Sequence, residues 1–139
     1  MLISGDMLLP RISTNVSVLA ATPDADALAW FLDSLQRFRD LPGDTLVLPS
    51  HGYPFHGIET RVQELVRHHG ERCAVLRAAC GAPKSAGELL PVLFPRELDT
   101  HQVMFAMGEA IAHLNHLLAR GEVRRLIGDD GIMRYQTKT

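Results

Sequence analysis

The stretch Leu46–Gly57, LVLPSHGYPFHG, constrains the fold of this chain more than any other part of it. The apolar residues before Pro49 are typical of a short buried strand, and the glycine and second proline that follow are typical of a stiff turn. We therefore expect His51 to lie at the end of a sheet strand, where side chains face a cleft more often than a core. A tight turn with an incidental histidine is the alternative, because one histidine beside a glycine is a weak signal.

A helix is predicted over about residues 24–41, before this strand. Thr22-Pro23-Asp24 supplies a capping hydroxyl, a proline for the first helical position and an acid for the first turn. The residues Pro42-Gly43 end the helix and lead into a strand at 45–49. The apolar residues that recur at helical spacing are Leu28, Phe31, Leu32, Leu35 and Phe38.

Two candidate metal ligands each follow a predicted strand. Met1–Gly5 is a short apolar segment that is followed directly by Asp6, and the strand at 45–49 ends just before His51. Ligands gather at the carboxyl ends of strands in open α/β sheets, and carboxylate and imidazole groups both bind zinc. Zinc takes three or four protein ligands, however, and the chain has no HxH, HxxxH, HExxH or CxxC spacing to supply the others.

A second, mostly helical region begins at Gly57. Its apolar stripe predicts a long helix from Ile58 to near Gly81, and Ser85-Ala-Gly-Glu88 is a capping box for a short helix through Leu93. The stripe of the long helix consists of Ile58, Val62, Leu65, Val66, His69, Cys73, Leu76 and Cys80.

A third helix and a hairpin are predicted after Leu93. Asp99-Thr-His-Gln102 is a looser capping signal, and Gly121 is expected to end the helix. Short strands at 122–127 and 132–136 flank Asp130-Gly131, which favours a tight turn. Three helices followed by a two-stranded hairpin predict a winged-helix-like module.

The remaining histidines and the cysteines have structural interpretations. His69 lies on the apolar stripe of the long helix, so we expect a core histidine. His56 is expected in a surface loop, and a place in the same cleft as His51 is the alternative. His113 and His116 lie three residues apart and have no third ligand nearby, which favours paired surface or interface residues over a metal site. Cys73 and Cys80 are expected to pack in the core as free thiols.

Composition and charge exclude several classes of protein. Hydrophobic residues make up 46% of the chain and charged residues 22%, which is typical of a globular protein that buries a core. No apolar run approaches the ~18 residues that a membrane helix needs, and neither half of the chain has the strongly basic balance typical of a nucleic-acid-binding domain. Without a signal peptide or a disulfide pattern, a cytoplasmic protein is expected. Contact with RNA or DNA through the arginines of the hairpin stays open.

The order of these features resembles the carboxyl half of the metallo-β-lactamase-fold hydrolases. The branch it resembles has a winged-helix tail and includes glyoxalase II-like and endoribonuclease-like proteins. The resemblance rests on Leu2-Ile-Ser-Gly-Asp6, Leu9–Ser13, Val47-Leu-Pro-Ser-His51-Gly52, His68-His-Gly-Glu-Arg72 and the tail that follows.

This resemblance implies a fold, a cofactor and a site. The fold is α/β and then mostly α, with a partial αββα half-sandwich at residues 1–57 and a long helix with a winged-helix-like tail at 58–139. Asp6 is implied as the ligand that bridges two zinc ions, and His51 as the last histidine ligand. The implied reaction is hydrolysis of an ester, a thioester or a phosphodiester.

The family's HxHxDH signature and the amino half of its sandwich are missing from the sequence. We therefore expect a carboxyl-terminal fragment that is inactive alone, binds zinc weakly or not at all, and has the missing amino half as its partner. A non-enzymatic winged-helix module for dimerisation or nucleic-acid contact is the alternative. A homodimer that covers the exposed sheet is a third possibility, because half a sandwich leaves apolar surface uncovered.

Overall fold

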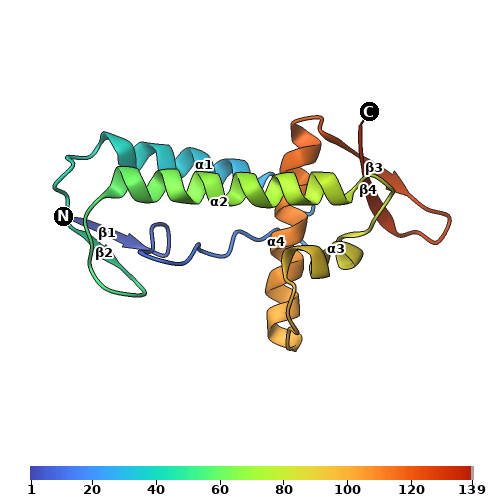
Figure 1. Cartoon of the computed structure of the whole chain (residues 1–139), viewed down its shortest axis with the longest axis horizontal. Coiled ribbons are helices and arrows are strands. Elements are labelled where there is room, and N and C mark those ends of the chain that lie inside the picture. Colours follow the sequence, from blue (N-terminus) through green and yellow to red (C-terminus); the bar gives the residue numbers. More distant parts are fainter. Residues whose placement is uncertain (139) are drawn as a thin grey trace. The chain divides into compact units, whose positions relative to one another are not determined.

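The structure is a computed structural model that describes residues 1–138. Figure 1 labels its helices and strands, and the chain divides into two compact units. The first combines Met1–Asn15 with Ala29–His69, and the second combines Val16–Leu28 with the residues from Gly70 onward. The elements are β1 (Leu2–Gly5), α1 (Ala27–Gln36), the short 3-10 helix η1 (Arg37–Asp40), β2 (Val47–Pro49), α2 (Ile58–Ala79), α3 (Ala86–Leu93), α4 (Thr100–Ala119), β3 (Val123–Ile127) and β4 (Met133–Thr137).

Strands β1 and β2 of the first unit pair in parallel, with Leu2 opposite Val47. The chain then folds back after β2, because Val47 and Phe55 exchange two backbone hydrogen bonds of 2.8 and 3.1 Å. Parallel pairing places the carboxyl ends of both strands at one edge of the sheet. The residues that follow β1 and β2 are therefore neighbours in space.

The core of the first unit gathers apolar side chains from its loops, strands and helices, and it also contains the buried His69. His69 is buried as predicted, and its Nε2 lies 3.0 Å from the Oγ of Ser13. The ring of Phe31 meets the His69 ring edge-on, with 5.5 Å between ring centroids. The buried apolar residues of this unit are Leu8, Leu9, Phe31, Leu35, Val47, Ile58, Val62 and Leu65.

Helix α1 begins at Ala27, so the predicted start at residue 24 is wrong. Residues 22–25 form a turn whose carbonyls at Pro23 and Ala25 accept hydrogen bonds from the Nδ2 of Asn115, at 2.8 and 3.1 Å. The acid expected in the first helical turn, Asp24, pairs instead with Arg125. These contacts between distant parts of the second unit hold residues 22–25 in the turn, and they outweigh the local start signal.

The second unit packs α3, α4, the Gly70–Ala79 part of α2 and the β3–β4 hairpin around one core. The hairpin turn contains Gly131 at φ +73°, as the Asp130-Gly131 pair predicts. Lys84 exchanges two backbone hydrogen bonds with Tyr135, of 3.0 and 2.8 Å, so the loop before α3 extends the pairing of β4. The buried core consists of Leu76, Cys80, Leu89, Leu93, Ala110, Leu114, Leu117, Val123 and Tyr135.

The middle of α4 is buried on more sides than one apolar stripe predicts. Small residues allow this burial: a Cβ atom added at Gly108 would lie 2.8 Å from the Oγ of Ser17, and the Val18 N–H donates to the Gly108 carbonyl. The prediction of paired surface or interface histidines on this helix is therefore wrong. His113 is buried with its Nδ1 2.8 Å from the Glu109 carbonyl, and His116 lies 3.1 Å from Asp26.

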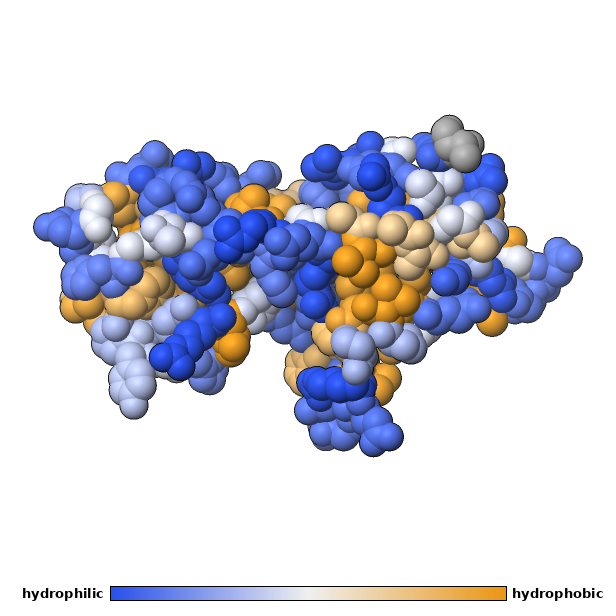
Figure 2. Space-filling model, viewed as in Figure 1, coloured by the Kyte–Doolittle hydropathy of each residue, from blue (hydrophilic) through white to orange (hydrophobic). Residues whose placement is uncertain are grey.

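Large apolar side chains are exposed on the surface of both units. Figure 2 shows hydrophobic areas among a mostly hydrophilic surface. In the first unit, Ile3 and Trp30 expose most of their surface, and in the second unit Met104 and Phe105 do the same. Within residues 1–138, no helix combines the length and the apolar character that a membrane span requires.

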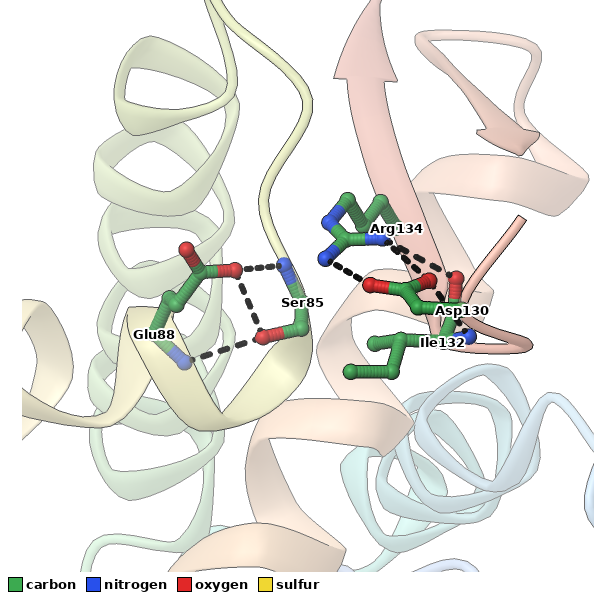
Figure 3. Close-up of polar contacts among 5 residues, drawn as sticks. All are labelled: Ser85, Glu88, Asp130, Ile132 and Arg134. Atoms are coloured by element: carbon green, nitrogen blue, oxygen red, sulfur yellow. Dashed lines mark hydrogen bonds and ion pairs between the residues drawn. The ribbon is translucent and has the colours of Figure 1, made fainter. Parts of the chain in front are cut away.

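Both predicted capping boxes are present, at the starts of α3 and α4. The box that opens α3 is shown in Figure 3, and its contribution to stability can be tested. The Oγ of Ser85 accepts from the Glu88 N–H at 3.3 Å, and the Glu88 carboxylate accepts from the Ser85 N–H at 2.8 Å. Ser85→Ala is expected to lower the free energy of unfolding by about 1 kcal/mol, measured by urea denaturation. The matched control is Ser34→Ala, because the Ser34 hydroxyl donates to the Trp30 carbonyl within α1 and caps no helix end. An equal loss in both variants would contradict the capping role.

The Ser85–Glu88 contact also predicts a dependence on pH. The Ser85 N–H holds the pKa of the Glu88 carboxyl below its ordinary value. The contribution of Glu88 to stability is therefore present above that ordinary pKa and is lost as the pH falls through the lower pKa of the folded state.

Candidate metal centre

Asp6 and His51 lie together at the edge where β1 and β2 end, as their positions after two strands predict. The distance between the His51 Nε2 and the Asp6 Oδ1 is 3.6 Å. Their side chains are 69% and 61% exposed, so both side chains are largely open to solvent in this part of the protein. The pairing of two short parallel strands thus brings together residues that are far apart in the sequence.

The turn after β1 holds Asp6 in place. Gly5 has a φ of +54°, a conformation that favours glycine, and its carbonyl accepts the Ser50 N–H at 3.0 Å. The Ser50 hydroxyl donates to the Asp6 Oδ1. Ser50 therefore orients the carboxylate, a role that the sequence does not reveal because the two residues are paired only by the sheet.

The turn after β2 requires glycine directly after His51. Gly52 has a φ of +85°, and a Cβ atom there would lie 2.6 Å from the Cγ of Pro10. Gly52 therefore allows the loop at Pro10 to lie against the turn that carries His51. The same close approach forms one side of a pocket.

A pocket of about 370 Å³ adjoins His51. One wall is formed by Pro10, Arg11 and Ile12, and the other by residues His51–Phe55. Apart from Arg11 and His51, the side chains that line it are apolar or aromatic. Sequence reasoning does not identify this pocket, because its walls come from loops about 40 positions apart in the chain.

The donor types and the spacing of Asp6 and His51 suit zinc, but the set is incomplete. Two ligands on one tetrahedral zinc, with bonds of about 2.0–2.1 Å, lie about 3.3 Å apart, close to the 3.6 Å observed. Zinc sites nevertheless need three or four protein ligands. Within residues 1–138, no group of three or more His, Cys, Asp or Glu side chains is placed to hold a metal ion.

The cysteines are poorly suited to catalysis or to metal binding. Burial raises the pKa of the Cys73 thiol to about 11, and burial also raises the pKa of Cys80. Both thiols are free and stay protonated at neutral pH, and a protonated thiol is neither a nucleophile nor a good metal ligand. Their packing agrees with the predicted structural role.

The arginines of the β3–β4 hairpin have partners within the second unit. Arg124 donates to Gln136 at 2.6 Å, Arg125 pairs with Asp24, and Arg134 donates to Asp130 at 2.7 Å (Figure 3). The Arg134 guanidinium lowers the pKa of the Asp130 carboxyl to about 2. Nucleic-acid contact through this hairpin stays a prediction, and any phosphate would compete with these internal partners.

Comparisons with known proteins give the family context of these features. Residues 73–138 match the family model described as "Metallo-beta-lactamase-like, C-terminal domain". A beta-lactamase domain protein from Burkholderia ambifaria is 54% identical to the chain, with a TM-score of 0.95 over 98% of it. A metallo-beta-lactamase family protein from Thermus thermophilus is 37% identical, with a TM-score of 0.82 over 98% of the chain. No curated protein matches.

The chain spans only part of these two relatives, since it covers 41% of the length of each solved structure. The matched family model covers α3, α4 and the hairpin, and the structural matches extend through both units. The chain therefore contains a metallo-beta-lactamase-like C-terminal domain, and it resembles part of metallo-beta-lactamase family structures along nearly its whole length.

Proposed function

We propose that this chain is the carboxyl part of a metal-dependent hydrolase of the metallo-β-lactamase superfamily. Asp6 and His51 supply two ligands of a dinuclear zinc site, and residues outside the chain supply the others. The observation that carries the proposal is the 3.6 Å separation of these two side chains at the ends of paired strands. The longer relatives support it, because each has room for a further set of ligands.

The proposed reaction is hydrolysis of an ester, a thioester or a phosphodiester. Zinc in hydrolases acts as a Lewis acid and activates water. The contribution of this chain is to hold donor atoms: Asp6 is oriented by the Ser50 hydroxyl, and His51 is held on the turn that Gly52 permits. The chain alone is proposed to be inactive, since two ligands do not complete a zinc site.

We also propose that the second unit is the winged-helix tail of the glyoxalase II-like or endoribonuclease-like branch. The order of α2, α3, α4 and the hairpin supports this assignment. The backbone pairing of Lys84 with Tyr135 supports it further, because it adds a short third segment beside the β3–β4 hairpin.

The test of the metal site is substitution in a longer protein that joins this chain to the amino half of the fold. His51→Ala is expected to lower the zinc content and to reduce kcat/KM for 4-nitrophenyl esters. We expect a loss of about 100-fold or more, because groups that only support a metal ligand already contribute about 10–100-fold. Zinc is measured by mass spectrometry of the purified protein.

The matched control is His56→Ala, an exposed histidine in the same loop that does not line the pocket. It is expected to keep both zinc and activity. If His51→Ala keeps full zinc and activity, the proposed ligand role is wrong. Tight stoichiometric zinc binding by the present chain alone would contradict the proposal that its site is incomplete.

A further inference from the structure

The pocket beside His51 is formed by two loops that the fold holds rigidly. Arg61 on α2 fixes the first loop: its Nε donates to the Leu9 carbonyl at 2.6 Å and its Nη2 to the Ile12 carbonyl at 3.0 Å. Arg61 is itself paired with Glu64 at 2.8 Å and is largely buried. The backbone on both sides of Pro10-Arg11 is therefore held by one side chain from a long helix.

The second loop is fixed by its own backbone pairing and by its contact with the first loop. Phe55 is paired through its backbone with Val47, and Gly52 packs directly against Pro10. Both walls of the pocket are thus attached to β2 or α2 of the same unit, and the pocket exists without a ligand. A volume of about 370 Å³ falls within the range of about 300–1,000 Å³ that is typical of small-molecule sites.

The side chains around the pocket combine an apolar surface with one cation. Tyr53 is 86% exposed and Ile12 is 62% exposed, so large apolar groups stand in solvent at its rim. Arg11 is also exposed, and within residues 1–138 it has no ion pair or side-chain hydrogen bond. A ligand with an apolar body and a negative charge complements both features, since it covers the rim and pairs with the guanidinium.

We infer that this pocket binds the apolar acyl or aryl part of an anionic substrate, with Arg11 as the partner of its carboxylate. The inference rests on the proposed function, because His51 is shared between the pocket and the proposed metal site. Ile12 and Tyr53 cover the apolar part of the substrate. Arg11 thus selects for charge, and the aromatic rim selects for shape.

The test uses this chain, which contains the whole pocket, and requires no metal. The chain is titrated with 2-naphthoate and with the neutral analogue 2-naphthalenemethanol, and amide shifts are followed by NMR. Naphthoate is expected to shift the amides of Ile12, Tyr53 and Phe55. Arg11→Gln is expected to weaken naphthoate binding by about threefold to fivefold and to leave the alcohol unaffected, because the variant loses one exposed ion pair.

Two further variants separate charge from shape. Tyr53→Ala is expected to weaken binding of both probes, and Arg37→Gln, an exposed arginine of η1 outside the pocket, is expected to change neither. The inference is overturned if neither probe shifts the pocket amides at millimolar concentration. It is also overturned if Arg11→Gln affects both probes equally.

The outcome is independent of the test of the metal site. If His51→Ala removes zinc and activity from the longer protein while Tyr53→Ala leaves KM unchanged there, the pocket inference fails and the proposed function stands. If the chain binds naphthoate selectively but His51→Ala keeps its zinc, the metal proposal fails and the pocket remains an anion-selective binding site.

Discussion

Replacing Leu114 by alanine is expected to lower the free energy of unfolding of the second unit by about 2–5 kcal/mol. Leu114 has no exposed surface and lies at the centre of α4 in the core of this unit. Truncation removes buried methyl groups and leaves a cavity that the helix cannot close, since its neighbours are held by the hairpin and α3. Urea denaturation followed by circular dichroism measures the change.

The control for this prediction is Met104→Ala in the first turns of the same helix. Met104 is 62% exposed, so its truncation is expected to stay within about 0.5 kcal/mol of the parent chain. Both variants change helix propensity in the same direction, and the difference between them therefore reports burial. A loss below about 1 kcal/mol for Leu114→Ala would mean that α4 does not pack as described.

Local signals predict the secondary structure of the carboxyl-terminal part well. The apolar stripe that begins at Ile58 corresponds to α2, which ends at Ala79, and the capping boxes at Ser85 and Asp99 open α3 and α4. These features depend on residues three or four positions apart, so the sequence contains the whole interaction. The Asp130-Gly131 turn is correct for the same reason.

Contacts between distant residues account for the predictions that are wrong. The start of α1 is displaced by Asn115, which lies some 90 positions away from the carbonyls that it binds. The environment of His116 is likewise set by Asp26. No periodic pattern reports such pairs, because each depends on how the segment before α1 lies along α4 within the second unit.

The candidate site shows the same division between local and distant information. The proximity of Asp6 and His51 follows from a general property of strand ends, so the sequence predicts it. The pocket depends on Arg61 reaching the carbonyls of Leu9 and Ile12, some 50 positions away. Gly52 and Pro10 are visible in the sequence as turn residues, but their contact is not.

Replacing Arg72 by methionine is expected to lower the free energy of unfolding by about 3 kcal/mol, because it leaves a buried acid without its partner. The Arg72 Nε lies 3.0 Å from the Glu109 Oε1, and the two side chains are only 18% and 17% exposed. The Arg72 guanidinium also lies over the ring of Phe94, with its Cζ 4.6 Å from the ring centroid. The loss is measured by urea denaturation at pH 7.

The pH dependence identifies the cause of this loss. Burial raises the pKa of Glu109 above its ordinary value, and Arg72 partly opposes the rise. A raised pKa means that the protonated acid favours folding: this contribution is full below the ordinary pKa and is lost as the pH rises through the pKa of the folded state. Removing Arg72 raises that pKa further, so the deficit of Arg72→Met should shrink as the pH falls.

The double variant Arg72→Met with Glu109→Gln separates charge from packing. It has no unpaired buried charge, so it is expected to recover most of the stability lost in Arg72→Met at pH 7 and to show little of its pH dependence. Stability that stays low in the double variant at every pH would assign the loss to the contact with Phe94 instead. Recovery would mean that Arg72 serves mainly to neutralise Glu109, and that an uncharged pair at these two positions supports the same fold.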